Sequence, residues 1–310
     1  MKKTTTFLFV MLISVAMIYG QKFEQSFSGI DEIQLTTGSA DCRVVKSSGT
    51  SVTVTLDHTL GSDYEPIVEH RNGKLVIRDN DKRPRGDMNW TLSIPDNTKL
   101  KYTAGSGDIE IENLTIDLTS ISGSGDIEMN NVSGNITSTT GSGDIELDNF
   151  NGDFKANTGS GSISGDEVKG TIKVNCGSGT IAFNNVQAEI KGNVGSGNIR
   201  ITNFILAGNS AFNSGSGDVS VKLGATPAHA LSMNSGSGNS VLDRNGHALN
   251  ADIVMSASKK NGKITAPFKF DKEEEVEEGN RIIMKKYASL GSGNKVEISL
   301  GTGSGTAQIK

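Results

Sequence analysis

Residues 105–122 read GSGDIEIENLTIDLTSIS, and the pattern returns as GSGDIEMNNVSGNITSTT in 123–140 and as GSGDIELDNFNGDFKANT in 141–158. The triplet Gly-Ser-Gly that opens each unit begins at intervals of 18 residues, at Gly105, Gly123, Gly141, Gly159, Gly177 and Gly195. The triplet recurs at wider intervals at Gly215, Gly236, Gly291 and Gly303. A fixed period of this length identifies a repeat architecture before any other inference.

Apolar residues alternate with polar ones within each unit, which indicates strands with one buried face. The fifth position is always isoleucine: Ile109, Ile127, Ile145, Ile163 and Ile181. From the tenth position onward, apolar residues occupy even positions instead, as in Leu114, Val132, Phe150, Val168 and Val186. The alternation of apolar and polar residues shifts from odd to even positions near the ninth position, which is mostly asparagine. It shifts back across Gly-Ser-Gly. Because glycine and asparagine tolerate positive φ, each unit is predicted to contain two strands and two corners.

Neither strand has a hairpin partner within its own unit, so each is expected to pair in parallel with the same strand of the next unit. The sequence therefore predicts an all-β fold, a right-handed parallel β-helix (β-solenoid) of 18-residue coils with two strands per coil. A left-handed hexapeptide helix also has 18 residues per coil. It would need aliphatic residues at positions such as Thr115, Ser133 and Asn157, so we reject it.

Four regions are expected along the chain: a signal peptide (1–20), an irregular β region that caps one end (21–104), the regular solenoid (105–238), and irregular C-terminal coils (239–310) with a charged insertion (271–281). Asn72-Gly73 between two apolar runs predicts a hairpin in the first β region. The segment GSADCRVV (38–45) is similar to the start of a coil and places Cys42 at an inward position. The acidic run Glu273 to Glu278 is expected to form an exposed loop.

Residues 1–20 have the pattern of a secretory signal: Lys2 and Lys3, an apolar stretch from Phe7 to Ile18, and Gly20 before a polar start. The apolar stretch is short for a membrane-spanning helix, and no second one follows, so no membrane span is expected in the mature chain. An uncleaved signal that serves as an anchor is the lesser alternative. We expect export to the periplasm or to the cell surface and extracellular space.

Removal of residues 1–20 takes away two lysines and no acids, so the net charge changes from -5 to -7. This acidity disfavours nucleic acid as a partner. The chain has only two cysteines, Cys42 and Cys176, in coils several layers apart. Since a disulfide needs Cα atoms within about 7 Å, both are expected to be buried free thiols.

The N-terminal segment FSGIDEI (27–33), LVI (75–77), SIP (93–95) and the repeated GSGDI coils resemble the adhesin family of bacterial β-strand-repeat proteins, and are similar to auto-transporter adhesin head domains. The resemblance covers nearly the whole mature chain. It implies an exported β-solenoid and brings no catalytic motif with it.

No catalytic, cofactor-binding or metal-binding residues are predicted. A polysaccharide lyase on a β-helix is the enzyme alternative, and its chemistry needs convergent Asp, Arg, Lys or His on one face. The four histidines, which are scattered over irregular segments, are expected to be solvated or in loops: His58, His70, His229 and His247. The calcium-binding nonapeptide repeat is also rejected, because the second half of every coil lacks its motif.

One surface stands out, and we call it the acidic face: Asp108, Glu110, Asp126, Glu128, Asp144 and Glu146, at outward positions of three successive coils. Its first interpretation is a solvated surface whose charge prevents sheets from sticking together. The sharper hypothesis is weak binding of divalent cations or of a basic partner. We therefore expect a non-catalytic, adhesin-like or structural binding module without cofactors, whose partner is an envelope or extracellular protein or a glycan. An accessory role in envelope stress or signalling is a further alternative.

Overall fold

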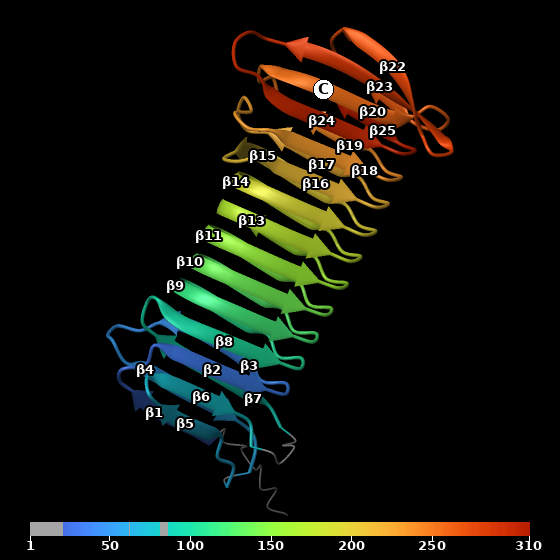
Figure 1. The fold of residues 1–310 in the computed structure, drawn as a ribbon. Coiled ribbons are helices and arrows are strands. Elements are labelled where there is room, and N and C mark those ends of the chain that lie inside the picture. The colour runs from blue at the N-terminus through green and yellow to red at the C-terminus, as the bar shows by residue number, and fades with distance from the viewer. Residues whose placement is uncertain (1–20, 62, 81–85) are drawn as a thin grey trace, which may run out of the picture.

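The computed structural model describes residues 21–61, 63–80 and 86–310, and the predicted signal peptide lies outside these residues. The described chain forms strands and turns without any helix, which confirms the all-β prediction. Figure 1 shows an elongated stack of strands, with the N-terminal strands at one end and β22 and β23 at the other.

The central coils are stacked in chain order. Their strands are β8 (Thr98–Ala104), β9 (Ile109–Ser122), β10 (Ile127–Thr140), β11 (Ile145–Thr158), β12 (Ile163–Asp166), β13 (Lys169–Cys176), β14 (Ile181–Val194), β15 (Ile199–Leu206), β16 (Ser210–Ser214), β17 (Val219–Leu223), β18 (Leu231–Ser235) and β19 (Ser240–Asp243). Neighbouring coils pair in parallel, as expected for strands that have no hairpin partner in their own unit.

Equivalent residues of successive coils lie directly opposite one another. Ile127 pairs with Ile109 on one side and with Ile145 on the other, each 18 positions away. The spacing of 18 already joins Thr98 to Ile116, and it widens after β15, where Ile199 pairs with Val219 and Val219 with Ser240. The strict period of 18 therefore holds from β8 to β15.

Each long strand bends at its ninth-position residue, where Asn113, Asn131 and Asn149 have φ between 51° and 55°. The side-chain amide of Asn131 donates to Asn113 (2.7 Å), and that of Asn149 donates to Asn131 (3.0 Å). Asparagine therefore both permits the corner and ties each corner to the next one. The bend divides the strands into two series, which we call ladder 1 (before the bend) and ladder 2 (after it).

The interior between the ladders is mostly apolar. The isoleucines of the fifth position are at most 1% exposed: Ile109, Ile127, Ile145, Ile163, Ile181 and Ile199. The Gly-Ser-Gly corners approach so closely that a Cβ added at Gly143 would lie 2.0 Å from the carbonyl oxygen of Gly125. Only glycine fits such an approach.

The N-terminal strands are not stacked in chain order. They are β1 (Gln21–Phe27), β2 (Glu32–Thr37), β3 (Asp41–Lys46), β4 (Val52–His58), β5 (Ile67–Arg71), β6 (Lys74–Arg78) and β7 (Met88–Ile94). β2 lies between β6 and β8, and β3 lies between β7 and β9, so the first coil of the chain is one layer inside the stack. Antiparallel β1, β4 and β5 complete this end, and β5 and β6 form the hairpin predicted at Asn72-Gly73.

At the C-terminal end, too, the last coil of the chain lies one layer inside the stack. Its strands are β20 (Ala251–Ser258), β21 (Lys263–Thr265), β22 (Lys272–Glu278), β23 (Arg281–Leu290), β24 (Val296–Thr302) and β25 (Thr306–Ile309). The last coil, β24 and β25, lies between β18–β19 and β20–β21. At both ends the inserted coil is 67 positions from its inner neighbour, as in Asp41 to Asp108 and Ser232 to Ser299.

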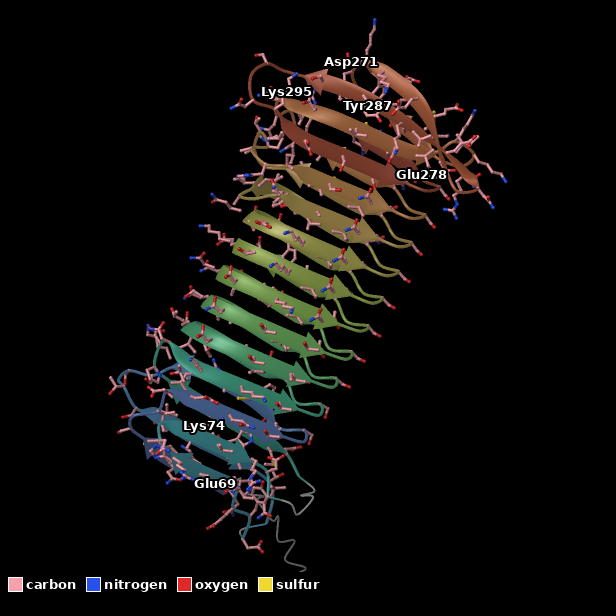
Figure 2. The ribbon with its side chains drawn as sticks, viewed as in Figure 1. Glu69, Lys74, Asp271, Glu278, Tyr287 and Lys295 are labelled. Carbon is pink, nitrogen blue, oxygen red and sulfur yellow. The ribbon has the colours of Figure 1, made fainter. Side chains whose placement is uncertain are left out.

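Two sequence predictions are wrong. The acidic run Glu273 to Glu278 is not a loop but belongs to β22, which pairs with β23 and places Glu273 opposite Lys286 and Glu274 opposite Lys285. Figure 2 shows Asp271, Glu278, Tyr287 and Lys295 in this part of the molecule, with Glu69 and Lys74 at the opposite end. His58 is neither solvated nor in a loop, because it lies in β4 at 5% exposure with its ring 5.3 Å from that of Tyr64.

Both cysteines are buried and unpaired, as predicted. Cys42 lies opposite Ile109 in ladder 1, which confirms the inward position assigned to it.

Candidate binding face

The acidic face lies on the outward side of ladder 1, at the start of β9, β10 and β11. Glu110, Glu128 and Glu146 are directly opposite one another in the register of these strands. The structure therefore brings together the side chains that the sequence placed in this column. Like charges at this separation repel one another, so the face needs compensation from elsewhere.

The aspartates of the face have a structural role that the sequence did not reveal. The carboxylate of Asp126 accepts the backbone N–H of Asp144 at 2.7 Å, and that of Asp144 accepts the N–H of Ser162 at 2.6 Å. The series begins at Asp41, whose carboxylate accepts the N–H of Asp108 at 3.0 Å. Each aspartate thus satisfies a backbone donor of the next corner with one of its oxygens.

Compensation comes from Arg43 of β3, which lies opposite Glu110. Its guanidinium is 2.7 Å from the carboxylate of Glu112 and 3.7 Å from that of Glu110. The hydrogen bond from Arg43 lowers the pKa of Glu112. Partial desolvation, with the neighbouring charge of Glu112, raises the pKa of Glu110. Sequence reasoning missed this arginine, although aligning GSADCRVV (38–45) with GSGDIEIE (105–112) places Arg43 beside Glu110.

Two shallow depressions lie along this outward side of ladder 1. The first, of about 410 Å³, is lined by Arg43, Asn89 and Thr91 together with acids of the face. The second, of about 480 Å³, lies farther along the stack and includes Asp148, Asp166, Arg200 and Thr202. Each depression thus combines carboxylates with a single arginine. Four strand spacings of about 4.8 Å, from the middle of the first depression to the middle of the second, place their centres roughly 19 Å apart.

The second depression lies where the repeat is interrupted. Gly165 occupies a position that is Leu147 in the preceding coil and Phe183 in the following one. The bend follows at once, at Glu167, whose φ is 54°. This bend is at the ninth position, as in the other coils, and the position of Gly165 faces inward, where Leu147 and Phe183 are buried. A Cβ added at Gly165 would lie 2.9 Å from Phe183 and from Val168, so their side chains fill this space.

Within residues 21–61, 63–80 and 86–310, no group of three or more His, Cys, Asp or Glu side chains is placed to hold a metal ion. The aspartate oxygens used by backbone N–H groups are already occupied. What remains is a set of hydrogen-bond acceptors with an arginine donor in each depression, which is suited to a hydroxyl-rich ligand.

Over the same described residues, the structure has no helix long and apolar enough to cross a membrane.

Comparisons with solved structures find several similar bacterial chains. A "putative adhesin" of Bacteroides fragilis NCTC 9343 is 12% identical, with 94% of this chain and 97% of that chain covered and a TM-score of 0.33. A "putative adhesin" of Parabacteroides merdae ATCC 43184 is 9% identical over 94% and 96% of the two chains, with a TM-score of 0.35. A "putative lipid binding protein" of Parabacteroides distasonis ATCC 8503 is 15% identical over 94% and 97%, with a TM-score of 0.36.

No protein with a curated description matches the chain. A family model does match it, over residues 30–267, which include the first coil, all the regular coils and β20 and β21. The chain therefore belongs to the Toastrack DUF4097 family.

Proposed function

We propose that this protein is an exported, non-catalytic binding module of the bacterial cell envelope, adhesin-like in its role, which holds an extended glycan along the outward side of ladder 1. The observation that carries the proposal is the pair of depressions, each with carboxylates and one arginine, on one continuous side of the stack. Carboxylates accept hydrogen bonds from sugar hydroxyls, and arginine donates them.

The rigidity of the support favours this function. The depressions are held by parallel strands whose residues stay in register from coil to coil, so their separation is fixed before the ligand arrives. A preorganised site loses less conformational entropy on binding. A linear polymer with a repeating unit can then occupy both depressions at once, which raises its apparent affinity without new contacts.

The sequence supports the proposed location. The lysines and the apolar stretch of residues 2–18 support export, and the resemblance to adhesin repeats supports a place in the periplasm or on the surface. We further propose that the coil is right-handed, because parallel crossovers nearly always have this hand.

The test is a glycan array probed with purified protein, together with an assay for newly formed reducing ends. Arg43→Met/Arg200→Met should abolish array binding, since each depression loses its donor. Lys155→Met/Lys173→Met is the matched control, because it removes the same charge from the outward side of ladder 2 and should bind as the unmodified protein does. Release of reducing ends, or no glycan bound by the unmodified protein, would refute the proposal.

A further inference from the structure

A second site lies at the C-terminal end, where the stack of Gly-Ser-Gly corners stops. In coil after coil, the first corner residue donates its backbone N–H to the last strand residue of the coil beneath, as Gly236 does to Ser214 (2.9 Å) and Gly303 to Ser235 (3.1 Å). Ser258 occupies this position in the coil of β20 and β21, since it follows Ala257, which pairs with Thr302. The next residue, Lys259, donates its N–H to the carbonyl of Ile282 in β23, at 2.9 Å.

The reason is steric. A Cβ added at Gly303 would lie 2.1 Å from the carbonyl oxygen of Gly236, so close stacking at this position requires glycine. Ser258 has a Cβ, and the chain after it turns outward, so that Lys259 meets β23 of the terminal hairpin. The departure of this corner from the stack leaves a hollow between the last glycine corner and the hairpin tip.

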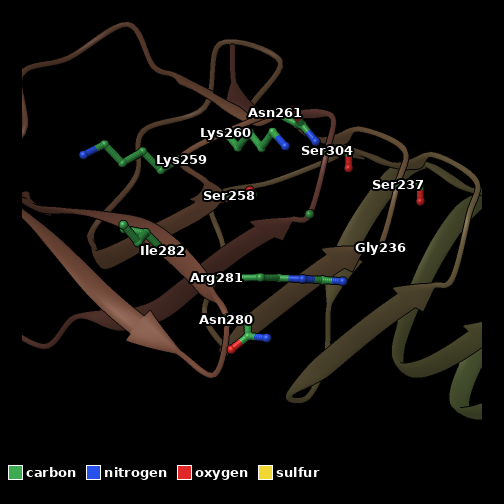
Figure 3. A pocket seen from close by; sticks show the side chains of 11 residues that line it. Gly236, Ser237, Ser258, Lys259, Lys260, Asn261, Asn280, Arg281, Ile282 and Ser304 are labelled. Carbon is green, nitrogen blue, oxygen red and sulfur yellow. The ribbon is translucent and has the colours of Figure 1, made fainter.

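The hollow has a volume of about 670 Å³ (Figure 3). It is lined by the glycine corners, by three serines and two asparagines, and by three cations and one isoleucine: Gly236, Ser237, Ser258, Lys259, Lys260, Asn261, Asn280, Arg281, Ile282, Gly303 and Ser304. No carboxylate is among these lining residues. In Figure 3 the Arg281 side chain extends toward the strand end at Gly236, whereas Lys259 points away from it.

The cations at this end of the molecule differ in their partners. Several lysines have carboxylate partners within 4 Å, including Lys272 with Glu274, Lys286 with Glu273 and Lys295 with Asp252. Lys259, at the mouth, pairs with Glu275 at 2.8 Å. Lys260 and Arg281 have no acidic partner among the residues that the structure describes.

Two cations without an acidic partner, in a hollow that no carboxylate lines, favour an anionic ligand in this chain of net charge -5. Guanidinium binds two oxygens of a phosphate at once, and the ammonium group of lysine adds a compact charge. The hydroxyls of Ser237 and Ser304 supply neutral donors. Ile282, which is 40% exposed, offers apolar contact to whatever carries the anion.

We propose that this hollow binds a phosphate monoester, with Arg281 and Lys260 as its charge-bearing ligands and Ser237 and Ser304 as hydroxyl donors. The carrier of the phosphate is a phosphorylated sugar or a lipid headgroup, and the two share the chemistry that the hollow recognises. The site lies at the end of the stack, apart from the two depressions of ladder 1, so it does not depend on the function proposed there.

The experiment titrates purified protein with glucose 6-phosphate, with glucose, and with vesicles of phosphatidic acid in phosphatidylcholine or of phosphatidylcholine alone. Binding of glucose 6-phosphate but not of glucose identifies a soluble carrier. Binding only to vesicles that contain phosphatidic acid identifies a lipid carrier. Either result supports the site if Lys260→Gln/Arg281→Gln weakens binding at least tenfold.

Lys169→Gln/Lys222→Gln is the matched control, because both lysines are exposed and lie outside the hollow. It should bind as the unmodified protein does. The variant Arg43→Met/Arg200→Met should also keep phosphate binding, which separates this site from the glycan face. Failure of the unmodified protein to bind any phosphate probe, or equal weakening in the control variant, would overturn the proposal. Circular dichroism and melting curves show that each variant is folded.

Discussion

The carboxylate of Asp108 accepts a hydrogen bond from the backbone N–H of Asp126, with 2.8 Å between oxygen and nitrogen. The same bond recurs from coil to coil. Farther along, the side-chain oxygen of Asn198 accepts the N–H of Asp218 at 2.8 Å. The corner therefore needs an oxygen acceptor at this position and does not need a charge. This relationship separates the structural role of the acidic face from any role in binding.

A triple change of Asp108, Asp126 and Asp144 to asparagine should keep or raise the melting temperature. It retains the acceptors and removes three like charges from neighbouring strands. The same three residues changed to alanine should lower the free energy of unfolding by about 0.5–1.5 kcal/mol for each lost hydrogen bond. Urea denaturation of both variants measures the difference. A rise in melting temperature with millimolar calcium, seen in the unmodified protein and absent from the asparagine variant, would instead establish cation binding at this face.

Much of the central stack can be predicted from the sequence, because the information is local and repeated. Isoleucine at the fifth position and asparagine at the ninth fix which side faces inward and where each strand bends, as Ile127 and Asn131 illustrate. The identity of the neighbouring coil follows from the period alone. The 18-residue period does not apply to β2 and β3, because their inner neighbours are 67 positions away. Their place inside the stack could therefore not be predicted from the sequence.

The candidate sites show the same limit. The column of acids was visible in the sequence, but Arg43 reaches it only through the distant pairing of β3 with β9. The acidic run in β22 resembled a loop, since nothing local shows that Lys286 lies opposite Glu273. The C-terminal hollow depends on the contact between the corner at Lys259 and β23. This contact cannot be predicted from a periodic pattern in the sequence.

Replacement of Ile145 by alanine should destabilise the protein by about 2–5 kcal/mol, because the side chain is fully buried between Ile127 and Ile163. Thr137→Ala, at an exposed position of β10, is the matched control and should change stability by less than about 0.5 kcal/mol. Guanidinium denaturation followed by circular dichroism gives both values. Since a stack of repeats can unfold in parts, a broadened transition for Ile145→Ala is also expected.

Gly143→Ala should be among the most damaging single changes in the corners. The new Cβ would lie 2.0 Å from the carbonyl oxygen of Gly125, and backbone on both sides must move to relieve the clash. We expect a loss of about 3 kcal/mol or more, at the upper end of the range for overpacking. Gly49→Ala is the control, because its Cβ would meet nothing within 4 Å. Equal melting temperatures for the two variants would show that the corners do not stack as closely as described here.

Cys42 should remain protonated and unreactive in the folded protein well above the pH at which free thiols ionise. Its side chain is 2% exposed, and burial, with the nearby charge of Asp41, raises its pKa far above the ordinary value of 9.0. Burial also raises the pKa of Cys176, whose thiol donates to the carbonyl of Gly161 at 2.9 Å. Because the thiolate is the reactive form, labelling by a disulfide reagent at pH 8 should be slow in the native protein and fast in urea.

The same pKa difference predicts how stability depends on pH. Below the unfolded pKa both states hold the proton of Cys42, so this thiol has no effect on the pH dependence of unfolding. Above pH 9 the unfolded chain loses that proton while the folded chain keeps it, so the free energy of unfolding falls as pH rises. Denaturation series at pH 8, 9 and 10 should show this decline, and Cys42→Ala should make it shallower although the variant is less stable at every pH. A variant with the same slope as the unmodified protein would mean that Cys42 ionises as readily when folded as when unfolded.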